Sequence, residues 1–181
     1  MSKTKKPEPA GVAAEYLSFN DFNNFINFLD FLQANSLKPR WIAKNAWEVK
    51  INNNQILRRL RINPEEKTWS VNLHFFWGYN EKITDDELKY FVWSNLRHNR
   101  CPHDAGNCRN YSTIDILGKP FDKMCCVGQI TIINPAGKAL EHTKELVLKA
   151  KAIIEEDGKI TDKKLSSRMD YSLIGSQPTK T

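Results

Sequence analysis

The segment Thr68-Trp-Ser-Val-Asn-Leu-His-Phe-Phe-Trp77 shows the clearest strand pattern in the chain. Large apolar side chains alternate with smaller or polar ones, which is the period of a β-strand with one buried face. The side chains predicted to face the core are those of Trp69, Val71, Leu73, Phe75 and Trp77. Those predicted to face away are Ser70, Asn72, His74 and Phe76. We therefore expect a central strand in an antiparallel sheet that has one solvated face.

Two further strands are predicted before this segment. Residues 41–51 alternate in the same way and place Trp41 and Trp47 on the inward face. Asn52-Asn53-Asn54 is expected to form a hairpin turn, because asparagine tolerates left-handed backbone conformations. Residues 55–62 form the return strand, and residues 63–67 turn into the central strand. The pattern predicts a three-stranded antiparallel meander.

Three segments carry the period of an amphipathic helix. The first runs from Phe19 to Leu32 after a polar cap at Ser18. The second begins at the capping box Thr84-Asp-Asp-Glu87 and is expected to end near His98. The third runs from Ala136 to Glu156. With further strands near Ile114 and Ile130, the sequence predicts an α+β fold in which three helices pack mainly on one face of the meander, extended by one or two further strands.

The domain limits follow from composition. Residues 1–16 are rich in Lys, Pro and Ala without periodicity, and we expect a disordered leader there. Residues 17–158 are expected to form one α+β domain, and residues 159–181 a mostly disordered tail. The chain has 181 residues, 40% hydrophobic and 27% charged, which is ordinary for a soluble protein. No apolar run approaches the roughly 20 residues of a membrane helix, so we expect a cytoplasmic protein with reduced thiols.

All four cysteines lie between residues 97 and 128, together with two of the four histidines. Thiolate and imidazole are the usual ligands of structural zinc, which suggests a candidate set of Cys101, His103, Cys108 and Cys125. Cys101 and His103 are closer in sequence than the ligands of a zinc knuckle normally are. The alternatives are reduced cysteines that pack as small apolar side chains, and cysteines used in redox chemistry or a disulfide.

The same region resembles a pattern in small uncharacterised bacterial proteins, in which a cysteine-rich loop precedes a Gly-Lys-x-Phe-Asp-x-x-Cys segment, an Asn-Pro turn and a terminal helix. Here that segment is residues 118–125, and the turn is Asn134-Pro135. The resemblance covers about residues 28–156 and implies an α+β domain without an established activity. In the pattern the first cysteine is followed by another three residues later, where this chain has Asp104.

A second group of candidate residues lies on the meander. Residues 38–61 carry seven basic side chains against one acid, Glu48, although much of the chain's net charge of +6 lies in the terminal segments. Basic side chains on a sheet can hold phosphates, and aromatic rings can stack on bases. The candidate residues for a ligand or a nucleic acid are Arg58, Arg59, Arg61, His74 and Trp77. A small-molecule concavity lined by Trp69, Phe75, Trp77, Tyr79 and Trp93 is a related prediction.

No familiar catalytic motif is present: the sequence has no nucleophile elbow, phosphate-binding glycine loop, HExxH or CxxC. The prediction is therefore a binding module for an unknown small molecule or protein, without a cofactor and without a membrane. The alternatives are a zinc-stabilised structural or interaction domain, a nucleic-acid-binding module that uses the basic hairpin, and an enzyme that depends on a reactive thiolate at Cys125 or Cys126.

Overall fold

A computed structural model describes residues 6–74, 78–98, 112–124 and 128–157. Its main element is an antiparallel sheet with the strand order β1-β2-β3-β4-β8-β5. The strands are β1 (Arg40–Ala43), β2 (Ala46–Ile51), β3 (Asn54–Asn63), β4 (Thr68–His74), β8 (Gly128–Ile133) and β5 (Leu96–His98). The predicted α+β fold is confirmed, with the segment from Thr68 at the centre of the sheet.

Asparagines make the tight turns of the meander. Asn52 and Asn53 have φ values of 48° and 67° and connect β2 to β3 as a two-residue loop. Positive φ at both central residues is the type I′ geometry, whose twist matches that of the flanking strands. Asn45 has a φ of 55° and makes the turn between β1 and β2. The predicted turn at residues 52–54 is confirmed, but residues 41–51 are two strands of a hairpin instead of one.

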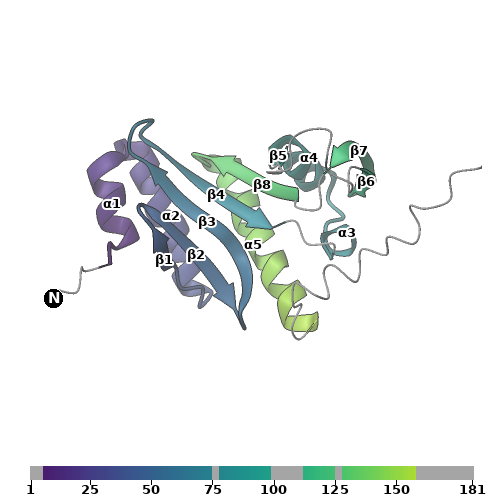
Figure 1. Ribbon diagram of the computed structural model, residues 1–181, viewed down its shortest axis with the longest axis horizontal. Coiled ribbons are helices and arrows are strands. Elements are labelled where there is room, and N and C mark those ends of the chain that lie inside the picture. Colours follow the sequence, from purple (N-terminus) through teal and green to yellow (C-terminus); the bar gives the residue numbers. More distant parts are fainter. Residues whose placement is uncertain (1–5, 75–77, 99–111, 125–127, 158–181) are drawn as a thin grey trace, which may run out of the picture.

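Helices pack on one face of the sheet. α1 (Pro9–Tyr16) contacts β3, α2 (Phe19–Ala34) contacts β4, and α5 (Gly137–Asp157) contacts β3. Figure 1 shows α2 and α5 behind the sheet. Phe25 and Phe28 of α2 place their rings 5.2 and 5.8 Å from Trp69 of β4. One hydrophobic core therefore extends from Val12 in α1 to Ile154 in α5.

The predicted disordered leader over residues 1–16 is wrong for its second half. Pro9 occupies the start of α1, where a missing N–H costs nothing. Val12 and Ala13 are buried, and the indole Nε1 of Trp47 donates to the carbonyl oxygen of Pro7 at 3.2 Å. Residues 7–16 are thus part of the covered face. Residues 1–5 and the predicted tail at 159–181 lie outside the described residues.

The remaining elements form a smaller unit beside β8. α3 (Tyr79–Lys82) and α4 (Asp86–Asn95) precede β5, and β6 (Ser112–Ile116) pairs with β7 (Lys119–Met124) in a separate two-stranded hairpin. The strand near Ile130 extends the main sheet as predicted, whereas the strand near Ile114 does not join it. The predicted second helix ends at Asn95, three residues before His98, because the chain becomes β5.

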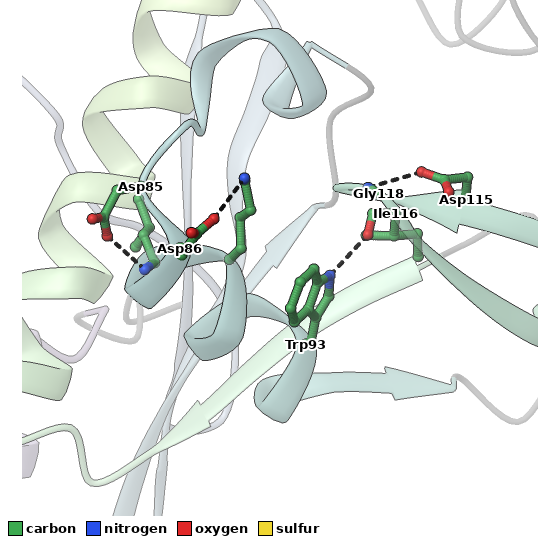
Figure 2. A network of polar contacts seen from close by, with 8 residues as sticks. Asp85, Asp86, Trp93, Asp115, Ile116 and Gly118 are labelled. Carbon is green, nitrogen blue, oxygen red and sulfur yellow. Dashed lines mark hydrogen bonds and ion pairs between the residues drawn. The ribbon is translucent and has the colours of Figure 1, made fainter.

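The β6–β7 hairpin is attached through its turn. Figure 2 shows the indole Nε1 of Trp93 in α4 donating to the carbonyl oxygen of Ile116 at 2.8 Å. The backbone N–H of Leu117 donates to Oδ1 of Asn80 in α3 at 3.0 Å. The same figure shows Asp85 capping α4, with Oδ1 accepting from the backbone N–H of Leu88 at 2.8 Å. The cap is therefore Asp85, one residue later than the predicted Thr84.

Candidate ligand-binding face

The sheet has one face that helices cover and one that they leave open. Residues opposite each other on neighbouring antiparallel strands share a face, so the register assigns every position. Val71 lies opposite Leu60, and both are buried on the helix side. Ser70 lies opposite Arg61 on the other side. No described helix crosses that side in Figure 1, and we call it the open face.

Polar side chains occupy the open face in three rows that run across the strands. The first row is Ile133, Ser70 and Arg61; the second is Thr131, Asn72 and Arg59; the third is Gln129, His74, Gln55 and Lys50. Arg40 of β1, opposite Glu48 of β2, adds a further pair at the edge. The face therefore carries four cationic side chains and one carboxylate, which gives it a positive charge.

Arg59 and Arg61 are the cations on this face without a partner. They lie two residues apart on β3, which places both side chains on one side of the strand at about 7 Å spacing. Both are exposed, and among the described residues neither forms an ion pair or a hydrogen bond through its guanidinium group. Lysines of α5 differ in this respect, because Lys144, Lys149 and Lys151 each pair with a glutamate of the same helix.

The third row continues into a chain of hydrogen bonds. Nζ of Lys50 lies 2.9 Å from Oε1 of Glu48, and Nε2 of Gln55 donates to Oε2 of Glu48 at 2.7 Å. Oε1 of Gln55 is 3.2 Å from Nε2 of His74. An ionised carboxylate only accepts hydrogen bonds, so Gln55 must turn its amide NH₂ toward Glu48 and its oxygen toward His74. A neutral His74 therefore carries its proton on Nε2.

Glu48 stays ionised in this arrangement. Burial raises the pKa of Glu48, but hydrogen bonds from Lys50 and Gln55, with the charges of Lys50 and Arg40, outweigh burial and bring the pKa below its ordinary value. Its side chain is only 12% exposed, so its charge is mostly used up within the protein. The single carboxylate consequently opposes an incoming anion much less than a free carboxylate would.

The structure brings together three of the five residues predicted for a ligand or a nucleic acid. Arg59, Arg61 and His74 share the open face. Arg58 is half-buried where the β3–β4 register shifts between Leu57 and Arg59. Trp77 lies outside the described residues.

The predicted zinc ligands also lie outside the described residues. This holds for Cys101, His103, Cys108 and Cys125. Among the residues described, no group of three or more His, Cys, Asp or Glu side chains could hold a metal ion. The strands on either side of the cysteine segments are paired, Ser112 with Met124 and His98 with Gly128. The zinc set therefore stays a prediction.

The aromatic concavity is wrong for two of its members. Trp69 and Tyr79 are completely buried, and the Tyr79 hydroxyl donates to the carbonyl oxygen of Leu146 at 3.1 Å. Burial raises the pKa of Tyr79 beyond its ordinary range, as expected for a core phenol. Trp93 is half-buried and holds the β6–β7 hairpin, with Lys119 Nζ 5.2 Å from its ring centroid. These three side chains stabilise the fold and line no common cavity.

Sequence reasoning did not select the hydrogen-bonding residues between the arginines and β8. Thr131 Oγ1 donates to Oδ1 of Asn72 at 2.8 Å, and Gln129 lies opposite His74. Asn72 was assigned to the outward face of the central strand, which is confirmed. Its neighbours on β8 come from a strand more than fifty residues away, and only the observed pairing of β4 with β8 places them beside it.

Comparisons with known proteins give this face no assigned function. A scan against protein-family models matched none, and searches of curated proteins and of solved structures found no significant match. Among the described helices, none is long and apolar enough to cross a membrane.

Proposed function

We propose that the protein is a binding module that holds a phosphate-bearing ligand on the open face of its sheet. The observation that carries the proposal is the pair Arg59 and Arg61, exposed on one side of β3 and without partners among the described residues. A guanidinium group presents a planar fork of N–H donors that matches two phosphate oxygens. Two such groups in adjacent rows suit consecutive phosphates or a polyphosphate.

The surroundings of the arginines support the same chemistry. Asn72 and Thr131 extend the row of Arg59, and Ser70 extends the row of Arg61, so hydroxyl and amide groups lie beside both cations. Such groups position phosphates and sugars in protein complexes with nucleic acids. A flat, uncovered sheet with a positive face also suits an extended single strand. The cytoplasmic location predicted from the sequence belongs to this proposal.

The test measures binding of a short, labelled, mixed-sequence single-stranded RNA at several salt concentrations, with inorganic tripolyphosphate as competitor. The double variant Arg59→Gln/Arg61→Gln should weaken binding and lower the slope of log affinity against log salt by about 2, one for each lost phosphate contact. The control is Lys6→Gln/Lys138→Gln, which removes the same charge from positions away from the open face and should leave the slope unchanged.

The competitor separates the two sources of phosphate. Displacement of the RNA by stoichiometric tripolyphosphate indicates a small phosphorylated ligand, whereas displacement only at large excess indicates a polymer. Equal binding by the double variant and the control contradicts the proposal, as does the absence of binding to both probes. The zinc-stabilised domain and the thiol-dependent enzyme rest on cysteines outside the described residues, so they remain alternatives without a supporting contact here.

A further inference from the structure

The second surface of interest is the free edge of β1, residues 40–43. β1 is the first strand in the sheet order and pairs with β2 alone. All four of its residues are exposed, in contrast to β2, where Ala46, Trp47 and Val49 are buried. Backbone N–H and C=O groups on the outer side of an edge strand have no strand to pair with, so they form a template for one more strand.

The edge carries apolar side chains on both sides of the strand. Trp41 is 39% exposed and Ile42 is 40% exposed, although both are large hydrophobic residues. Successive side chains of a strand point to opposite faces, so one ring and one aliphatic chain flank the free edge from either side. An added strand would cover part of both, which provides apolar burial in addition to backbone hydrogen bonds.

The charge around β1 selects among the strands that could add. Lys38, Arg40 and Lys44 lie at and beside the strand, and no acid occurs between Pro39 and Trp47. Among the described residues Lys38 and Lys44 form no ion pair, while Arg40 lies near Glu48 and lowers its pKa. Two copies of this edge would bring like charges together along their whole length, which is the device that protects edge strands from self-association.

We propose that the β1 edge binds an extended, acidic peptide segment of a partner protein, which adds to the sheet as a seventh strand. Carboxylates of the segment would pair with Lys38 and Lys44, and its apolar residues would pack on Trp41 and Ile42. Main-chain hydrogen bonds to the free edge would supply affinity, and the alternating side chains would supply specificity, as in other cases of β-strand addition. This inference is independent of the open face, because it uses none of Arg59, Arg61 or His74.

The test begins with selection from a random decapeptide library on the full chain. The expected winners place Asp or Glu on either side of two or three alternating apolar residues. The best peptide is then remade with alternate backbone nitrogens methylated, in both phases. One of the two phases should lose binding at least about tenfold, because it removes the N–H groups that face the edge.

Protein variants complete the test. Lys38→Glu/Lys44→Glu should weaken the selected peptide by at least about tenfold, because two attractions become repulsions. Arg59→Gln/Arg61→Gln, made for the open face, should leave peptide binding unchanged. An undisturbed far-ultraviolet spectrum and melting temperature would show that the charge-reversed variant still folds.

Three results would overturn the inference. The first is a library from which no peptide, or only peptides without acidic residues, emerges. The second is unchanged affinity after methylation in both phases, because binding would then not use the edge backbone. The third is a dimer in sedimentation experiments that Trp41→Ala dissociates, because the edge would then be occupied by a second copy of the chain.

Discussion

The two faces of the sheet are made from alternate residues of the same strands, yet they serve opposite purposes. On β4, Trp69, Val71 and Leu73 are fully buried under the helices, while Ser70, Asn72 and His74 keep partial exposure on the open face. The covered face is a packed apolar layer, and the open face is a hydrogen-bonded polar layer with two unpaired guanidinium groups. The difference shows that stability and ligand binding can be altered separately, one residue apart.

The largest effect is expected from Leu73→Ala. It removes a fully buried side chain of β4 and should lower the free energy of unfolding by about 2–5 kcal/mol, through lost burial and the remaining cavity. The matched control is Ser70→Ala on the open side of the same strand, which should change stability by no more than about 0.5 kcal/mol. Urea unfolding measures both. Equal losses in the two variants would contradict the assignment of faces.

A smaller effect is expected at α1, the element that the sequence analysis missed. Ala13→Asp places a carboxylate at a completely buried position and should cost about 2 kcal/mol. The cost is limited because α1 is terminal and can detach from the sheet. Ala14→Asp, at the neighbouring exposed position, is the control and should be nearly neutral. Unchanged stability in the Ala13 variant, measured in the same unfolding experiment, would mean that α1 does not cover the sheet.

The smallest effect concerns the open face itself. Because the pKa of Glu48 is lowered in the folded state, its charge contributes stability above its unfolded pKa, near 4.5, and this contribution is lost as the pH falls through the folded value. Glu48→Gln should therefore be less stable than the unmodified chain by about 1 kcal/mol at pH 7 and equal to it near pH 2. A difference that does not depend on pH would show that Glu48 is not held as a carboxylate by Lys50 and Gln55.

The central strand could be predicted from sequence because its pattern is local. Each of Trp69, Val71 and Leu73 faces the core as expected, and Arg59 and Arg61 face outward as expected. The meander was less complete, because Asn45 continues the alternation of residues 41–51 and so hides a turn at positive φ. As a result Trp41 was predicted to face inward, whereas it lies 39% exposed on an edge strand.

Elements with a weak local signal were missed. α1 is short, and its burial depends on Val12 and Ala13 alone, which give little periodicity amid charged and small residues. The place of β6 could not be read from Ile114, because pairing with β7 and docking on Asn80 and Trp93 involve contacts across the chain. The open face was half predicted for the same reason: its arginines lie within the meander, whereas its β8 residues arrive by long-range pairing.

The pairing of β4 with β8 also bears on how the chain folds. Asn134 locks the end of β8 to β4, since its N–H donates to the carbonyl oxygen of Trp69 and its Oδ1 accepts from the Trp69 N–H at 2.7 Å, across 65 residues. The meander closes through short turns and can form early, whereas β8 must wait for a long loop to close. Closure entropy grows only logarithmically with loop length, by about 0.6 kcal/mol per doubling. The chain between these two strands is thus where evolution can insert residues at small cost to the sheet.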